Sequence, residues 1–176
     1  MTVMHYLAYG SNLHPYRLTM RVSSAKPIAV VPLDRQQLVF HKRSRFGSGK
    51  CMLAPGAASD IAYGVLYEFD SREQAGLNKA EGVGLGYLAQ QCLVPVNGDT
   101  YNAYMYVAHS DYIDTSLSPV DWYKEMVVLG AEYHKLPQGY IESIRSVPSS
   151  VEARPAEVAQ ELKTLEQMRL INKSLT

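Results

Sequence analysis

Residues 6–13 read Tyr6-Leu7-Ala8-Tyr9-Gly10-Ser11-Asn12-Leu13. The first four are apolar or aromatic and continue a short run from Met4, which predicts a β-strand over Met4–Tyr9. Gly, Ser and Asn are common turn residues, so we expect this strand to end in a tight turn at Gly10. Backbone N–H groups at such a break can face outward together and bind an anion. Taken alone, however, a turn of this kind is ordinary.

Strand patterns continue through residue 108. The predicted strands are rich in β-branched and aromatic residues, and Asn97-Gly98 between the last two is a strong hairpin signal. They lie at Pro27–Phe40, Ile61–Phe69, Tyr87–Val96 and Tyr101–Ala108.

From Pro119 onward the spacing of apolar residues becomes helical. Ser118-Pro119 is expected to begin the first of these helices, with the serine as N-cap. The predicted helices are Pro119–Glu132, Pro137–Val147 and Pro155 to about Leu170. Strands first and helices afterwards favour an α+β fold over an alternating parallel sheet.

One helix is predicted among the strands. Ser71 and Gln74 have the spacing of a capping box, and Gly82 is suited to end the helix in a left-handed conformation. Glu81 therefore falls in the last turn, where exposed carbonyl groups disfavour a second negative charge. Without further information, this position is typical of a solvent-facing helix end.

The chain has 176 residues and balances 17 Lys and Arg against 17 Asp and Glu. This length fits one domain over residues 1–176, with 155–176 as its C-terminal helix and tail. Zero net charge does not favour nucleic acid or an anionic membrane as a partner. The sequence has no secretion signal or membrane span, so we expect a soluble cytoplasmic protein. Cys51 and Cys92 are expected to be buried free thiols.

Several candidate motifs do not have the spacing that their chemistry requires. Residues 82–86 are glycine-rich but follow a helix and lack the G-x-G-x-x-G spacing of dinucleotide loops. Gly49-Lys50 lacks the rest of a phosphate-binding loop. The five histidines have no metal-ligand spacing, so we predict no metal.

Two features suit a site for a small polar molecule. The basic segment 41–50 is typical of a solvated hairpin loop, and its alternative is a flap that attracts an anionic substrate. Thirteen tyrosines are also present, a residue type that provides an apolar wall with a hydroxyl group at its edge. Most of them are expected to fill strand faces.

Three segments in order resemble the γ-glutamylcyclotransferase family. They are the Tyr-Gly-Ser-Asn-Leu turn after the first strand, Glu81-Gly82-Val83 at a helix end, and a helical Ser-Pro…Tyr-Lys…Gly-Ala…Leu-Pro segment. The last begins at Ser118, and together the three extend from about residue 4 to residue 148. The glutathione-specific branch typically has leucine where Asn12 stands, so this chain looks less like that branch.

The resemblance implies a small mixed β-barrel with helices outside and a pocket at one end. It implies conversion of a γ-glutamyl amide into 5-oxoproline and a free amine, without a cofactor. By position, Glu81 matches the acid/base and Tyr123 a pocket tyrosine, whereas Tyr87 and Tyr104 match pocket tyrosines more loosely. The loop that holds the glutamyl group matches Tyr6, Leu7, Ala8, Tyr9, Gly10, Ser11 and Asn12.

This reaction needs a carboxyl group that first removes a proton from the substrate's α-amine and then protonates the departing amine. Burial and the helix C-terminus are both expected to raise the pKa of Glu81 toward about 6–7. The leaving group stays open, and cyclotransfer on a protected biosynthetic intermediate or a γ-glutamylamine is an alternative. A non-catalytic protein that binds an amino-acid-like ligand is another. The sequence is also compatible with a homodimer.

Overall fold

β1 (Val3–Ala8) is the middle strand of a five-stranded sheet with the order β2-β5-β1-β7-β6. It pairs antiparallel with β5 and parallel with β7, where Tyr6 lies opposite Tyr104. The other strands are β2 (Lys26–Asp34), β5 (Ile61–Asp70), β6 (Tyr87–Val96) and β7 (Asp99–Ala108). The computed structural model describes residues 2–175, so the first and last residues of the domain predicted over 1–176 lie outside it.

A second sheet is a hairpin of β3 (Gln36–Arg43) and β4 (Gly49–Pro55). The strand region predicted over Pro27–Phe40 thus comprises parts of two strands, divided at Arg35, whose φ is 57°. β4 was not among the predicted strands. Its sequence begins with Gly49-Lys50, which reads as loop, and it becomes a strand through pairing with β3.

The predicted α+β class is confirmed, because strands precede the main helices. The predicted barrel is not confirmed, since β2 and β6 are the edges of an open sheet within residues 2–175. The sheet nevertheless curls. Val31 of β2 and Val94 of β6 belong to one buried cluster with Leu7, Leu66 and Ala103.

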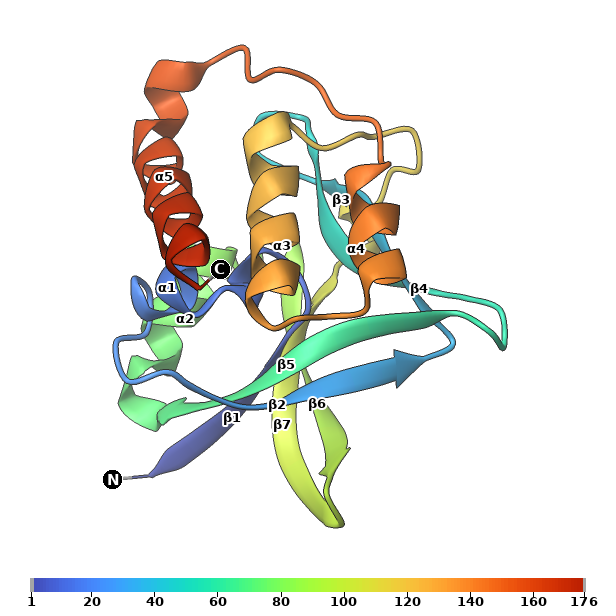
Figure 1. Cartoon of the computed structure of the whole chain (residues 1–176), viewed down its shortest axis with the longest axis vertical. Coiled ribbons are helices and arrows are strands. Elements are labelled where there is room, and N and C mark those ends of the chain that lie inside the picture. The colour runs from blue at the N-terminus through green and yellow to red at the C-terminus, as the bar shows by residue number, and fades with distance from the viewer. Residues whose placement is uncertain (1, 176) are drawn as a thin grey trace.

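Alternation along the strands gives each face of the sheet its own apolar cluster. Tyr6 and Ala8 of β1 face the main core, whereas Leu7 between them joins the smaller cluster on the opposite face. Figure 1 shows α3 (Asp121–Tyr133), α4 (Gln138–Arg145) and α5 (Ala159–Ser174) together on one side of the sheet. The predicted C-terminal helix is therefore present, preceded by a 3-10 turn at Pro155–Val158.

Two shorter helices complete the fold, α1 (Pro15–Thr19) and α2 (Gln74–Glu81), with a 3-10 helix η2 (Ser71–Glu73) before α2. Both predicted N-caps are wrong by one or two residues. Asp70 caps η2 instead of Ser71, because its carboxylate accepts a hydrogen bond from the Arg72 amide. Val120, without a side-chain cap, precedes α3 where Ser118 was expected.

Cys51 and Cys92 are free thiols, of which Cys51 is buried and Cys92 is half-buried. None of the helices formed by residues 2–175 is long and apolar enough to cross a membrane.

Fully buried His14 joins the turn after β1 to the C-terminal helix. Its Nδ1 accepts a hydrogen bond from the Tyr16 amide at 3.2 Å, and its Nε2 lies 3.1 Å from Oδ1 of Asn172. Both contacts are satisfied by the neutral ring with a proton on Nε2. Burial lowers the pKa of His14 to about 4.

We expect acid to destabilise the protein through this ring. Between about pH 6.5 and pH 4 the unfolded chain binds a proton that native His14 does not, so the free energy of unfolding falls as the pH falls. The slope is up to about 1.4 kcal/mol per pH unit for one site. Urea unfolding across this range should show the slope, and His14→Gln should flatten it. An equal slope in both proteins would contradict this assignment.

Candidate active site

The turn after β1 and the end of α2 meet at Asn12. The turn forms a 3-10 helix, η1 (Ser11–Leu13), and all three of its residues are buried. The Asn12 side-chain amide donates to Oε1 of Glu81 at 2.9 Å and to the Tyr6 hydroxyl at 3.1 Å. Sequence positions 69 apart thus share one hydrogen-bond network.

Glu81 is the last residue of helix α2, so the end of this helix holds its side chain beside Asn12. Gly82 follows with φ 65° and ψ 45°, the left-handed conformation that ends a helix and favours glycine. Both the end at Glu81 and the role of Gly82 are as predicted. The side chain of Glu81 is only 16% exposed, so the solvent-facing alternative is wrong.

A pocket opens at this junction. It brings together most of the residues that the resemblance assigns to the site. Its walls are formed by Tyr6, Tyr9, Gly10, Ser11, Asn12, Cys51, Glu81, Tyr87, Tyr106 and Tyr123.

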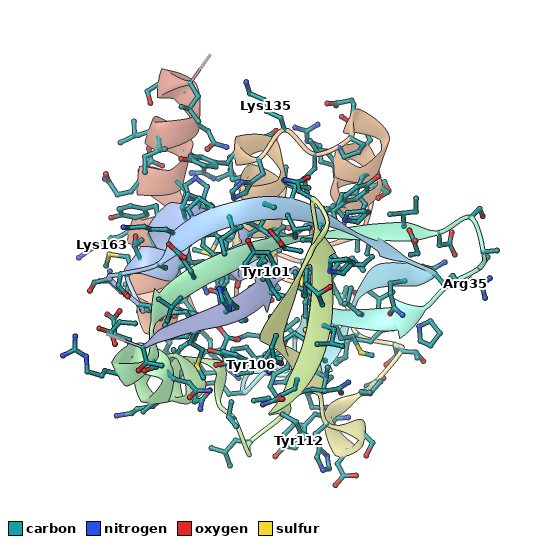
Figure 2. The ribbon with its side chains drawn as sticks, turned by 90° about the horizontal axis from the view of Figure 1, so that it is seen from below. Arg35, Tyr101, Tyr106, Tyr112, Lys135 and Lys163 are labelled. Carbon is teal, nitrogen blue, oxygen red and sulfur yellow. The ribbon has the colours of Figure 1, made fainter. Side chains whose placement is uncertain are left out.

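Three predicted residues do not line this pocket. Leu7 points to the opposite face of the sheet, and Ala8 packs in the main core. Tyr104 lies behind the wall, with its ring centroid 5.4 Å from that of Tyr6 and 5.5 Å from that of Tyr106. Conversely, the sequence reasoning missed Tyr106, labelled on β7 in Figure 2. The period of two along β7 puts it on the same face as Tyr104 and is a signal that could have found it.

Hydrogen bonds hold the tyrosine wall in place. The Tyr9 hydroxyl donates to the backbone carbonyl of Tyr106, and the Tyr87 hydroxyl donates to that of Cys51 at 2.6 Å. The Tyr123 hydroxyl accepts from the Cys51 amide at 3.2 Å. Burial raises the pKa of Tyr9, Tyr87 and Tyr123, so these phenols are neutral at physiological pH. A wall of neutral phenols can form hydrogen bonds to a bound polar molecule without adding charge.

Three cations act on the Glu81 carboxylate. Arg21 forms an ion pair with its Oε1 and also donates to Oδ1 of Asn12 at 3.0 Å. Arg17 and Lys50 act on the same carboxylate electrostatically. Arg17 is only 5% exposed, and its Nε has no hydrogen-bond partner within residues 2–175. One carboxylate therefore faces three positive charges.

The expected rise in the pKa of Glu81 is wrong for the free protein. Burial does raise this pKa, and it is the largest single influence. Arg21, Lys50 and Arg17 lower it, as does the Asn12 amide, and together they outweigh the burial. The pKa of Glu81 is therefore below its usual value, and the group is a carboxylate at neutral pH.

The basic segment 41–50 divides into a turn and two inward lysines. Residues 44–48 form the turn, and Arg45 at its tip is exposed. Lys42 and Lys50 face each other across the β3–β4 hairpin. Lys42 is 6% exposed, with Nζ 4.5 Å from the centroid of the Tyr87 ring. The solvated-loop interpretation is thus correct for the tip and wrong for both lysines.

Comparisons with known proteins place the chain beside one group of enzymes. Residues 62–144 match the profile of the AIG2-like family. The γ-glutamylcyclotransferase of Mus musculus is 28% identical over 153 residues, covering 81% of this chain and 77% of the mouse protein. That of Bos taurus is 26% identical and covers 89% of this chain and 86% of the bovine protein.

The fold comparison agrees with the sequence comparison. A solved structure of a γ-glutamyl cyclotransferase superposes with a TM-score of 0.74, covering 91% of this chain and 99% of that one, at 22% identity. The mixed α+β fold is therefore shared. The resemblance identified from the three sequence segments is confirmed.

Proposed function

We propose that this chain, a relative of the γ-glutamylcyclotransferases, converts a γ-glutamyl amide into 5-oxoproline and a free amine, with Glu81 as its acid/base. The substrate's α-amine attacks its own γ-carbonyl carbon, a C–N bond forms to close a five-membered ring, and the original amide C–N bond breaks. The observation that carries this proposal is the largely buried Glu81 carboxylate, hydrogen-bonded to Asn12 in a tyrosine-lined pocket.

Glu81 suits the first proton transfer because it is ionised. A free α-amino group has a pKa of about 7.7–8.0 and is mostly protonated at neutral pH, so it must lose a proton before it attacks. The carboxylate accepts that proton and becomes a carboxylic acid. It then donates the proton to the departing nitrogen, which completes the cycle without a net change in the enzyme.

Substrate binding changes the balance of charge around Glu81. The substrate's α-carboxylate brings a negative charge near Glu81, on which Arg21, Lys50 and Arg17 act electrostatically. A cation that binds the substrate's α-carboxylate stabilises the Glu81 anion less. The pKa of Glu81 therefore rises in the complex. The group is thus a stable anion in the free protein and a stronger base with substrate bound.

The remaining donors hold the glutamyl group. The first amides of a helix have no partner within it, so those at the start of η1 can bind the developing oxyanion. Because the attack is intramolecular, catalysis depends mainly on holding the substrate's glutamyl group in a folded conformation, with its α-amine near its γ-carbonyl. The tyrosine hydroxyl groups and the Asn12 amide line the space where this occurs.

A panel of γ-glutamyl dipeptides, with 5-oxoproline measured as product, tests this function. Release of 5-oxoproline from several dipeptides supports it. Release only from a γ-glutamylamine or a protected intermediate would favour the narrower cyclotransferase. Tight binding of one compound without turnover of any would mean a non-catalytic binding protein.

Replacing Arg21 with an uncharged residue should shift the acid limb of the kcat/KM profile to higher pH. Activity needs the Glu81 carboxylate, so kcat/KM falls as the pH drops through the pKa of Glu81 in the free enzyme. Arg21 is the strongest influence that lowers this pKa. In Arg21→Met the acid limb of the kcat/KM profile should therefore shift to higher pH. Lys79→Met, which removes an exposed lysine of α2, is the control and should keep the wild-type limb. An unshifted limb in Arg21→Met would contradict the assignment to Glu81.

A further inference from the structure

Arg17 is a buried cation without a direct partner. It lies in α1, shortly after Asn12, and is 5% exposed. Its Nε has no hydrogen-bond partner, and no carboxylate of residues 2–175 forms an ion pair with its guanidinium group at 4.0 Å or less. Burial lowers the pKa of Arg17 to about 10, so the group is still protonated at neutral pH. An unpaired charge in such a place destabilises the fold, and a functional role is the usual reason for keeping it.

Arg21, the next arginine along the chain, has the partners that Arg17 lacks. It forms an ion pair with Oε1 of Glu81 and donates to Oδ1 of Asn12 at 3.0 Å. Glu81 carries one negative charge, and Arg21 neutralises it. Arg17 attracts the same carboxylate from a greater distance and is repelled by Arg21. The charge of Arg17 is therefore surplus in the free protein.

This surplus charge acts on the pocket. Arg17 does not line the pocket itself, but it interacts electrostatically with Glu81 and Tyr123, two residues of the pocket wall. It also attracts Glu161, a half-buried residue of α5. Lys50 acts on Glu81 as well, but it lines a different pocket, between the β3–β4 turn and the start of α3. An anion that enters the pocket beside Glu81 is thus attracted by Arg17.

We propose that the buried charge of Arg17 holds the α-carboxylate of the substrate's glutamyl half in this pocket by electrostatic attraction. The chain keeps this charge at a cost in stability, because its partner arrives with the substrate. This inference rests on the proposed function, since it assigns a residue to one group of the same substrate.

Protein stability separates this role from a structural one. Arg17→Met replaces an unpaired buried cation by an unbranched apolar side chain, so the midpoint of urea unfolding should rise. Arg21→Met is the matched variant. It removes the ion-pair partner of Glu81, and its midpoint should fall. A lower midpoint in Arg17→Met would overturn the inference, because the attraction of Arg17 to Glu81 and Glu161 would then stabilise the fold.

Two substrates that differ in the α-carboxylate test the binding role. They are γ-glutamyl-alanine and the same compound with the glutamyl α-carboxylate converted to a carboxamide. Release of alanine is measured for both, above the acid limb of every variant, and the ratio of the two kcat/KM values is compared between variants. Arg17→Met should reduce the preference for the carboxylate by at least about tenfold, which equals the attraction of two unit charges about 12 Å apart at an effective dielectric constant of about 20. Lys79→Met should retain the preference.

Two results of this comparison would contradict the role of Arg17. An equal loss on both substrates in Arg17→Met would overturn the inference, because Arg17 would then act only through Glu81. An unchanged ratio of the two kcat/KM values would overturn it as well.

A binding measurement separates this inference from the proposed function. Calorimetry compares 5-oxoproline, which keeps the α-carboxylate, with its uncharged carboxamide, and it needs no turnover. If the wild type turns over neither dipeptide, the proposed function fails. Tighter binding of 5-oxoproline that is lost in Arg17→Met would still support the role of Arg17. No preference of the wild type for 5-oxoproline would overturn that role.

Discussion

Glu81→Gln is expected to keep the fold and lose at least about 100-fold in the rate of 5-oxoproline release. Glutamine has the same shape, and its side-chain oxygen can still accept the hydrogen bond from Asn12 that Glu81 accepts at 2.9 Å. It cannot take up a proton from the α-amine or pass one to the departing nitrogen. The loss should therefore appear in kcat as well as in kcat/KM.

Glu81 forms an ion pair with Arg21, so the Glu81→Gln experiment needs a control variant that also loses one ion pair. Glu81→Gln removes one ion pair, and the variant can lose some stability for that reason alone. Glu166→Gln removes the ion pair of an exposed glutamate on α5 with Arg169 and should turn over at the wild-type rate. Circular dichroism and urea unfolding would show that both variants are folded at the assay temperature. Wild-type 5-oxoproline release by folded Glu81→Gln would refute the catalytic role.

Gly130→Ala is expected to destabilise the protein, although alanine is the better helix former. Gly130 lies in α3 where this helix packs on the turn after β1. A Cβ at this position would lie 2.6 Å from Cβ of Leu13 and 2.9 Å from the backbone nitrogen of His14. A change of rotamer cannot relieve a contact with backbone, so the helix or the turn must move. Overpacking of this kind costs about 1–3 kcal/mol, against a helix gain of at most about 1 kcal/mol.

Gly139→Ala is the matched control for this substitution. Gly139 is also helical, in α4, and a Cβ there would have nothing within 4 Å. Alanine should therefore stabilise the protein by up to about 1 kcal/mol. Urea unfolding would measure both effects, and they should have opposite signs. Changes of the same sign would mean that the contact of α3 with the turn is not tight.

The effect of Gly130→Ala should extend to catalysis. Leu13 and His14 directly follow Asn12, whose amide reaches Glu81 and whose Oδ1 accepts from Arg21. A displaced turn lengthens these contacts, so kcat/KM should fall in the folded variant. The helical segment beginning at Ser118 thus supports the site through its packing as well as through Tyr123.

Much of the fold was predictable because its signals are local. The apolar and aromatic run of β1, the Asn97-Gly98 hairpin and the end of α2 at Gly82 each depend on a few adjacent residues. The caps were less predictable, because neighbouring polar residues compete for the same amides. Asp70 is one residue away from the predicted Ser71 and accepts the hydrogen bond instead.

The parts of the candidate site that lie in short continuous segments of sequence were predictable. Glu81 at a helix end and the turn through Asn12 were both expected, and they meet in one pocket. The cations were missed, although Arg17 and Arg21 follow the turn closely with the four-residue spacing that is typical of one side of a helix. α1 ends at Thr19, so Arg21 lies beyond it. Lys50 was noticed only as one residue of a basic loop, since its inward direction depends on the pairing of β3 with β4.

The order of residues along the chain thus determines the class of fold, the turn after the first strand and a glutamate at the end of a helix, because hydrophobic period and turn chemistry act over short distances. Folding in three dimensions decides the charge around that glutamate. Arg21 is 60 positions away from Glu81, and it reaches the carboxylate only when the segment after α1 lies against the end of α2. The pKa of Glu81 is a sum of opposing influences from distant residues, and no local pattern in the sequence carries its sign.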